Sequence, residues 1–341
     1  MMKRRLLLGL GLVIIALGAW SLGQTPSLSI PTETRLVPQP PPDPAAVALF
    51  AASLSAIPDH TGVRLSSNPV LGIAMTLRHV RAGPLLALDY QRPEPLRGRG
   101  LVTDGRHWWA VGVDTVPALL REVLMSQVGT DLDLVVQHYH LRLADEETVA
   151  GRPAAQLEFV QNNRVIERRW IDAETSLELR REQYDEGEEL VTASGFIQLE
   201  YGVSNQDMVR LSHITATAPI AEGPAKFLSL AETSQAAGFA LQPPAYLPAG
   251  FRLLGGLVPA RGQAYLIYTD GLRQLVLYQE PVPWYARWLP RAMQPATGTS
   301  LGRAETLITR RQVGGLNCAV ICSLLVGERR RIAESIGTLR P

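Results

Sequence analysis

Apolar and polar residues alternate with a period of two along much of the chain before residue 190, which predicts half-buried β-strands. The alternating stretches are residues 73–80, 85–90, 98–113, 134–143, 154–160, 164–171 and 177–184. Pairs that favour turns lie within or between these stretches: Asp104-Gly105, Asn162-Asn163 and Glu186-Gly187. Short strands joined by tight turns predict one large antiparallel sheet.

Two further segments carry apolar residues at helical spacing. Residues 45–57 follow Asp43 and end before Pro58, and residues 116–128 hold several leucines and valines on one side. Helices near the beginning of a run of strands pack on a face of the sheet that the strands form. The first part of the chain is therefore predicted to have an α+β fold.

The pattern weakens after Gly202 into an irregular stretch that reaches about Pro224. Residues 227–239 then look helical, and residues 329–339 look like a closing amphipathic helix. Four strands are expected in between, at residues 251–257, 264–269, 273–280 and 318–325. This pattern predicts a second, smaller α+β domain, with no repeat between the two halves.

The beginning of the chain reads as an export segment. Positive residues at positions 3–5 precede an apolar run from Leu6 to Trp20, and small residues recur at Ala19, Ser21 and Gly23. This layout fits a signal peptide cleaved before Gln24, or an uncleaved N-terminal anchor. Both alternatives place the rest of the chain outside the cytoplasm, in the periplasm or another extracytoplasmic space. The expected organisation is 1–23 as signal peptide or anchor, 24–44 as Pro-rich linker, 45–203 as sheet domain, 204–226 as inter-domain linker and 227–341 as small C-terminal domain.

Composition narrows the class of protein. The chain has 341 residues, 46% hydrophobic and 19% charged, with a net charge of +1, which supplies a core and gives no attraction to nucleic acid. Cys318 and Cys322 are the two cysteines. On one strand they would lie about 13 Å apart, beyond the roughly 7 Å that a disulfide spans, whereas a helix or hairpin would let them close.

Signals of catalysis or of a cofactor are absent from the sequence. No nucleophile elbow, zinc-protease motif, phosphate loop or dinucleotide fingerprint occurs. His138 and His140 share one face of a strand but lack a third metal ligand, so neither a metal nor a cofactor is expected. Trp108 and Trp109 are adjacent on a strand, so one faces each side of the sheet. An aromatic group beside several prolines is either wedged into a domain interface or exposed to a partner: Trp284, Tyr285 and Trp288.

Two segments resemble one known family. The first spans residues 139–201, and the second spans residues 246–281 with an Asp-Gly turn between two apolar strands. The residues that carry the resemblance are Gly151, Arg152, Trp170, Asp172, Tyr268, Asp270 and Gly271. Both segments occur in the order found in the RseB/MucB family, whose members are periplasmic regulators of an envelope-stress sigma factor. Residues 60–99 depart from that family's pattern.

The resemblance implies a first domain like the lipoprotein carriers LolA and LolB, in which a curved antiparallel half-barrel wraps helices and encloses an apolar cavity. It also implies a partner, the extracytoplasmic domain of a membrane-bound anti-sigma factor, and lipid or lipoprotein acyl chains as ligands that release it. Alternation lets only one face of each strand line such a cavity, and the register is open. The cavity candidates are Met75, Leu77, Leu86, Leu88 and Trp109, and the aromatic group above is the candidate partner contact.

Several functions fit these features. The first is a sensor that holds an anti-sigma factor until an apolar ligand enters. The second is a periplasmic carrier of lipid or lipidated cargo, which would work with the first domain alone, so the second domain counts against it. A structural envelope protein is the third, and a hydrolase with scattered catalytic residues is the fourth.

Overall fold

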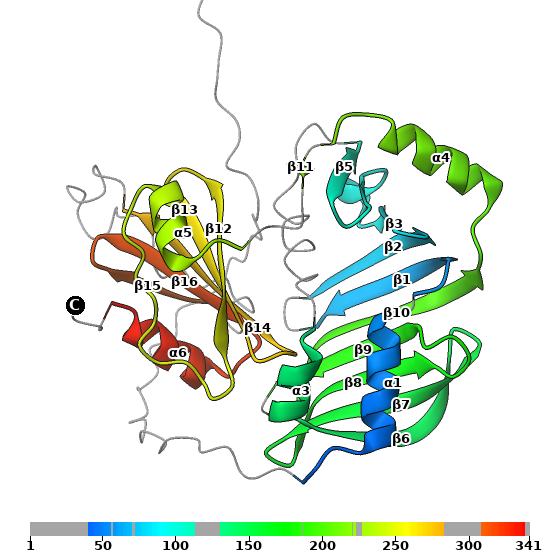
Figure 1. The fold of residues 1–341 in the computed structure, drawn as a ribbon, viewed down its shortest axis with the longest axis horizontal. Helices are drawn as coiled ribbons and strands as arrows, with labels where there is room; N and C mark the ends of the chain where they lie inside the picture. Colours follow the sequence, from blue (N-terminus) through cyan, green and yellow to red (C-terminus); the bar gives the residue numbers. More distant parts are fainter. Residues whose placement is uncertain are drawn as a thin grey trace, which may run out of the picture.

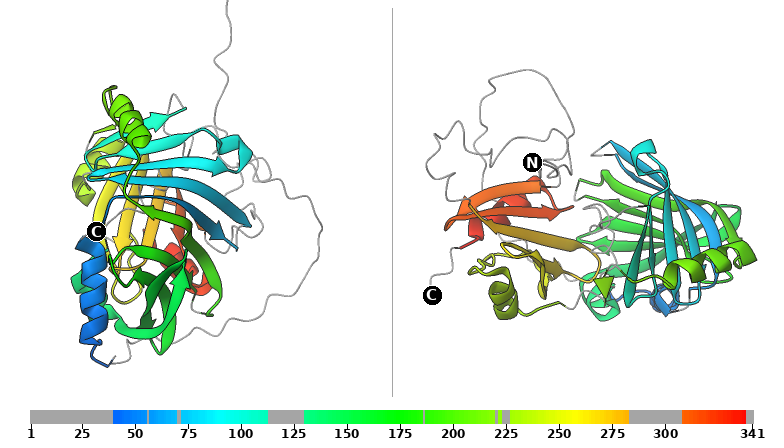
Figure 2. Two further views of the ribbon diagram at one scale, coloured as in Figure 1. Left: turned by 90° about the vertical axis from the view of Figure 1, so that its right-hand side faces the viewer. Right: turned by 90° about the horizontal axis from the view of Figure 1, so that it is seen from above.

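The structure is a computed structural model that describes residues 40–55, 57–69, 72–112, 130–185, 187–219, 221–222, 227–282 and 308–337. These residues form an eleven-stranded antiparallel sheet and a five-stranded antiparallel sheet, with short helices on each (Figure 1). The large sheet is strongly curved and does not close, and the small domain lies beside it (Figure 2). This arrangement confirms the predicted fold class, an open curved sheet with helices followed by a smaller α+β domain.

The large sheet is two meanders joined through β1 and β10, which pair with each other. Its order is β11-β5-β4-β3-β2-β1-β10-β9-β8-β7-β6. The strands are β1 (His60–Asn68), β2 (Ile73–Ala82), β3 (Leu85–Arg92), β4 (Gly100–Thr103), β5 (His107–Val111), β6 (His140–Val149), β7 (Arg152–Gln161), β8 (Arg164–Asp172), β9 (Glu178–Tyr184), β10 (Leu190–Tyr201) and β11 (Ala221–Glu222). The Asp104-Gly105 and Asn162-Asn163 turns separate β4 from β5 and β7 from β8, as predicted.

One face of this sheet is covered in part by α1 (Pro44–Ser55). Phe50 of α1 meets Phe159 of β7 edge to face, with ring centroids 5.0 Å apart. The Arg169 guanidinium of β8 lies over the same two rings. The helix therefore anchors on the β6–β8 end of the sheet.

The opposite face is covered at the other end by α4 (Asn205–Thr215). Arg78 and Asp89 alternate with residues of the α1 face, and they pair with Asp207 and Arg210 of α4. Leu211 of α4 packs into the apolar cluster between them. The two helices thus lie on opposite faces of the sheet.

Two segments adopt another form than the one the sequence predicted. Residues 202–224 were expected to be irregular, yet they form α4 and β11, because Ser204 caps the helix and Asp207 and Arg210 find partners on distant strands. The expected strand 134–143 begins instead as a helix, α3 (Leu132–His138), because the Asp131 side chain accepts from the backbone N–H of Leu134. Its strand starts at β6. The domain limits themselves stay a prediction.

The small sheet has the order β12-β13-β14-β16-β15. The elements of the small domain are α5 (Leu230–Ala237), β12 (Arg252–Ala260), β13 (Gln263–Thr269), β14 (Gln274–Pro281), β15 (Ile308–Val313), β16 (Leu316–Cys322) and α6 (Val326–Ser335). A short 3-10 turn, η1 (Glu94–Leu96), lies between β3 and β4 of the large sheet. Both cysteines lie on β16 as buried free thiols, as the single-strand geometry predicted, and burial raises the pKa of Cys318 to about 11. β15 was not foreseen.

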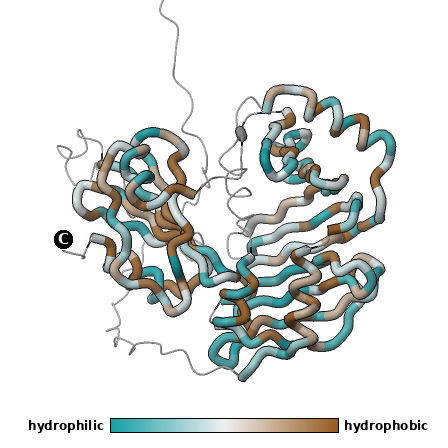
Figure 3. The backbone as a smooth tube through the Cα atoms, in the orientation of Figure 1, coloured by the Kyte–Doolittle hydropathy of each residue, from teal (hydrophilic) through white to brown (hydrophobic). Residues whose placement is uncertain are grey.

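Hydropathy is distributed differently in the two sheets. Brown, apolar segments gather in the strands of the small domain, whereas teal, polar stretches run along the strands beside α1 (Figure 3). The small domain has an ordinary apolar core that contains Leu266, Leu277 and Val320. The large sheet has separate apolar clusters, with charged side chains between them.

Candidate functional site

Four of the five predicted cavity residues share one face of the large sheet. Leu77 of β2 pairs with Tyr90 of β3. Because alternate residues of a strand share a face, Met75 of β2 and Leu86 and Leu88 of β3 lie on the same side of the sheet. Leu77 packs in an apolar cluster with Tyr90, Leu101 and Trp108, against which Met75, Leu88 and Leu96 are partly buried. This is the same face of the sheet that α1 covers at the β6–β8 end.

The fifth residue, Trp109, faces the other way. It packs with Val102 and Leu211 beneath α4, and its Nε1 donates to the backbone oxygen of Thr217 at 3.0 Å. Trp108, its neighbour, lies with Leu77. The prediction that the two tryptophans face opposite sides of the sheet is therefore confirmed. Trp109, the one predicted to line the cavity, lies on the opposite face from the other four cavity candidates.

The middle of the α1 face carries a cluster of ionic side chains that the sequence analysis did not identify. Arg64 and Arg169 share the Glu178 carboxylate at 3.1 and 3.3 Å, and Arg169 and Arg181 share that of Glu167 at 2.6 and 2.8 Å. Burial would raise the pKa of Glu178, but these arginines hold it below its usual range. A sequence signal did exist, since charged residues occupy both faces of β8.

A pair of histidines adjoins this cluster on the same face. His60 Nδ1 lies 2.7 Å from the backbone oxygen of Pro58, and His60 Nε2 lies 2.9 Å from His79 Nδ1. The rings stack with centroids 4.9 Å apart, and both meet Phe196 edge to face. The geometry fits neutral rings, with His60 donating to Pro58 and His79 donating to His60.

Protonation of the histidine pair is expected to destabilise the fold. Burial, followed by the nearby Arg64, holds the pKa of His79 well below its usual value, and burial also lowers that of His60 despite its bond to Pro58 and the charge of Asp59. The unfolded chain therefore binds more protons below about pH 6.5, so stability is full above that pH and falls as the pH drops. The expected loss is on the order of 1 kcal/mol per pH unit between pH 6.5 and 5.

Thermal unfolding at pH 7.5, 6.5 and 5.5 measures this loss. His79→Asn keeps an N–H near the Nδ1 position and should flatten the dependence on pH. The control is His213→Asn, because His213 is exposed on α4. Equal slopes for the His79 variant and the parent protein would contradict the assignment.

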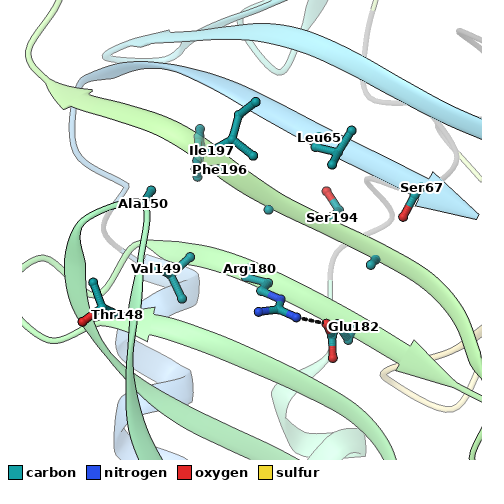
Figure 4. A pocket seen from close by; sticks show the side chains of 12 residues that line it. Leu65, Ser67, Thr148, Val149, Ala150, Arg180, Glu182, Ser194, Phe196 and Ile197 are labelled. Carbon is teal, nitrogen blue, oxygen red and sulfur yellow. Dashed lines mark hydrogen bonds and ion pairs between the residues drawn. The ribbon is translucent and has the colours of Figure 1, made fainter.

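A shallow pocket of about 450 Å³ lies on the other face of the sheet, between the β6–β7 hairpin and the strands β9, β10 and β1 (Figure 4). Leu65 and Ile197 extend from neighbouring strands at one side, and Val149 lies across from them. Arg180 and Glu182 pair along the floor of the pocket. None of the predicted cavity residues lines it.

The two domains meet through the turn of the β13–β14 hairpin, which reaches α3 of the first domain. The fully buried Asp270 carboxylate accepts from Arg273 Nε at 2.9 Å and from Tyr139 Oη at 2.5 Å. Arg273 Nη2 also donates to Gln161 Oε1 at 2.8 Å. Gly271, at φ +99°, packs so closely that an added Cβ would lie 2.7 Å from the Cβ of Leu134. The predicted Asp-Gly turn is therefore also the contact between domains.

The motif residues of the first domain surround the β8–β9 turn. Asp172 is fully buried, pairs with Arg152 and accepts from the backbone N–H groups of Glu174 and Thr175, each at 2.9 Å. Gly151 stands in the turn before Arg152, at φ +79°. Trp170 Nε1 donates to Glu147 at 2.6 Å, and the Arg180 guanidinium lies over its ring. Tyr268 is buried in the core of the small domain, where burial raises its pKa.

The remaining features considered from the sequence are the aromatic group, a metal site at the histidines and a membrane-spanning segment. Trp284, Tyr285 and Trp288 lie outside the described residues. Within the described ranges, no group of three potential metal ligands occurs, and His138 Nδ1 lies 3.1 Å from the backbone oxygen of Asp270. No helix among the residues placed by the structure has both the length and the apolar character needed to cross a membrane.

Comparison with known proteins bears on both domains. The MucB/RseB N-terminal domain family matches residues 112–215, which end with α4. This segment of the chain, most of the second half of the large sheet and α4, is similar to that family. A crystal structure of MucB is 21% identical, with a TM-score of 0.59, and the match covers 86% of this chain and 98% of MucB. No curated protein sequence matches the chain.

Two further structures of MucB match at 20% identity. MucB in complex with MucA(peri) gives a TM-score of 0.53 over 88% of this chain, and the MucA/MucB complex of Pseudomonas aeruginosa gives 0.55 over 87%. Each match covers 99% of the MucB chain. At this identity the likeness establishes a shared two-domain fold. Residues 60–99, which depart from the family's pattern, lie before the matched segment.

Proposed function

We propose that the chain is an extracytoplasmic negative regulator that binds the extracytoplasmic part of a membrane-bound anti-sigma factor. The observation that carries this proposal is the match to both domains of MucB in its complex with MucA(peri). That match covers 99% of the MucB chain and 88% of this chain. In this role the chain binds a protein partner and catalyses no reaction.

The contact between the domains supports a regulator over a carrier. A carrier of lipidated cargo would need only the large sheet, whereas here the small domain is docked on it through Asp270, Arg273 and Tyr139. A buried polar contact of this kind fixes how two domains present one surface. A partner that contacts both domains would bind only when they are held in that arrangement.

The proposal includes an apolar ligand on the α1 face of the sheet. Met75, Leu77, Leu86 and Leu88 offer it side chains on one side of β2 and β3. Because binding free energies are reciprocal, a ligand that weakens the partner by some factor is itself weakened by the partner to the same extent. Residues 1–23 would export or tether the protein, and residues 24–44 would space it from the membrane.

Direct binding to the anti-sigma factor is the expected result. The full-length protein, extracted in mild detergent, should bind the immobilised extracytoplasmic part of the MucA-type protein from the same organism with a Kd of about 1 μM or tighter, which corresponds to about −8 kcal/mol. Biolayer interferometry measures this affinity. Absence of binding at 50-fold higher concentration would remove the regulator function.

The aromatic segment is the proposed contact. Replacing Trp284, Tyr285 and Trp288 together by alanine should weaken binding at least tenfold, because aromatic side chains dominate most interfaces. Ile197→Ala serves as the control, since Ile197 is an exposed apolar residue on the large sheet. Equal affinity of the two variants would exclude the aromatic segment and leave the binding function itself untouched.

A further inference from the structure

The ionic cluster on the α1 face carries an unbalanced charge. It contains three arginines, Arg64, Arg169 and Arg181, against two carboxylates, Glu167 and Glu178, so 3 − 2 leaves a formal charge of +1. Glu167 and Arg169 are 0% and 2% exposed. Buried charges in proteins are ordinarily compensated, because an uncompensated one loses its hydration.

Two donors in the cluster are buried without a hydrogen-bond partner. They are Arg169 Nη2 and Arg181 Nε. A buried donor with no acceptor costs about 1–3 kcal/mol. The Phe50 and Phe159 rings face the Arg169 guanidinium and offset part of this cost, but they remove no charge. A ligand with a single negative charge would balance the charge of the cluster and offer an acceptor to Arg181.

The cluster also continues into the apolar face. Arg64 of β1 lies directly opposite Leu77 of β2, and Leu77 belongs to the apolar cluster with Tyr90 and Leu101. Met75 and Leu88, beside it, are only partly buried. Arg64 and Arg181 keep 22% and 28% of their side chains exposed, so a ligand can reach them. One face thus offers a cationic group and an apolar surface side by side.

We infer that this face binds a long-chain fatty acid, with its carboxylate at Arg64 and Arg181 and its acyl chain along Met75, Leu77 and Leu88. A carboxylate accepts from guanidinium groups in a bidentate manner, and the bond is charge-assisted. The inference rests on the proposed apolar ligand and adds the chemistry of its head group. It predicts preference for an anion over a neutral lipid of the same chain.

Displacement of N-phenyl-1-naphthylamine, a neutral fluorescent probe, from the delipidated full-length protein tests the inference. Oleate should displace the probe at a concentration at least ten times lower than oleyl alcohol. Arg64→Gln and Arg181→Gln should each weaken oleate about tenfold and leave oleyl alcohol unchanged. Each variant leaves Glu178 and Glu167 paired with Arg169, so the fold is retained, which thermal unfolding verifies.

Arg180→Gln is the matched control. Arg180 precedes Arg181 on β9 but points to the opposite face, where it pairs with Glu182. This variant should bind both lipids as the parent does. Equal displacement by oleate and oleyl alcohol would overturn the fatty-acid inference while leaving an apolar site. If neither lipid binds, both the inference and the sensing of lipids fail, whereas anti-sigma binding is judged by its own assay.

Discussion

Replacing Asp270 by asparagine is expected to destabilise the protein by about 3–5 kcal/mol, because it removes one partner of a buried ion pair and leaves the other charged. Asp270 is fully buried, and its carboxylate accepts from the backbone N–H groups of Leu272 and Arg273, from Arg273 Nε and from Tyr139 Oη. Arg273 would lose its carboxylate partner and keep its hydrogen bond to Gln161 across the interface. Urea unfolding followed by tryptophan fluorescence measures the loss.

Two companion variants separate the charge from the docking of the domains. Tyr139→Phe removes one hydrogen bond and keeps the ion pair, so its cost should be about 1–2 kcal/mol. Gly271→Ala adds a Cβ where Leu134 already lies, without touching any charge. It should loosen the domains, which small-angle scattering would record as a larger radius of gyration. A loss of less than 1 kcal/mol for Asp270→Asn would show that the pair is dispensable.

This contact shows how far the sequence could lead. Asp270-Gly271 was correctly predicted as a hairpin turn, because the local preference of the pair for turns suffices. Its second role depends on Tyr139 and Gln161, more than a hundred residues earlier in the chain. No local pattern encodes such a meeting, so the turn was recognised and the interface was not.

The strand β1 was missed by the sequence analysis for a physical reason. β1 reads His-Thr-Gly-Val-Arg-Leu-Ser-Ser-Asn, and its α1 face carries His60 and Arg64 where a strand usually places apolar residues. A period-two search for apolar residues therefore passes over it. β8 was found as a strand, but its charged residues Glu167 and Arg169 on the same covered face were not recognised as a site. Polar residues on a covered face therefore kept β1 from being recognised as a strand and the ionic cluster from being recognised as a site.

Replacing Asp172 by alanine is expected to cost the first domain about 3–4 kcal/mol, a large share of the 5–15 kcal/mol typical of a folded protein. The buried Asp172 carboxylate holds Arg152 and the backbone N–H groups of Glu174 and Thr175, and Tyr201 Oη donates to it at 3.1 Å. Without it the β8–β9 turn keeps its backbone bonds but loses its organising acceptor. Unfolding by urea, followed by circular dichroism, gives the free energy.

Glu174→Gln is a control on the same arginine. Glu174 pairs with Arg152 as Asp172 does, but its side chain is 78% exposed, so this change should cost less than about 0.5 kcal/mol. The two variants compare one guanidinium with a buried and an exposed carboxylate. Similar losses would mean that burial does not decide the strength of the pair.

The pH dependence provides an independent test of the same turn. Burial alone would raise the pKa of Asp172, but Arg152 and the backbone N–H groups of Thr175 and Glu174 hold it below its usual value of about 4. The native state therefore binds fewer protons than the unfolded chain in that range. The stabilisation is present above about pH 4 and is lost as the pH falls through the native pKa. The free energy of unfolding of Asp172→Asn should therefore fall less steeply than that of the parent as the pH drops below about 4. That of the Glu174→Gln variant should fall as steeply as the parent's.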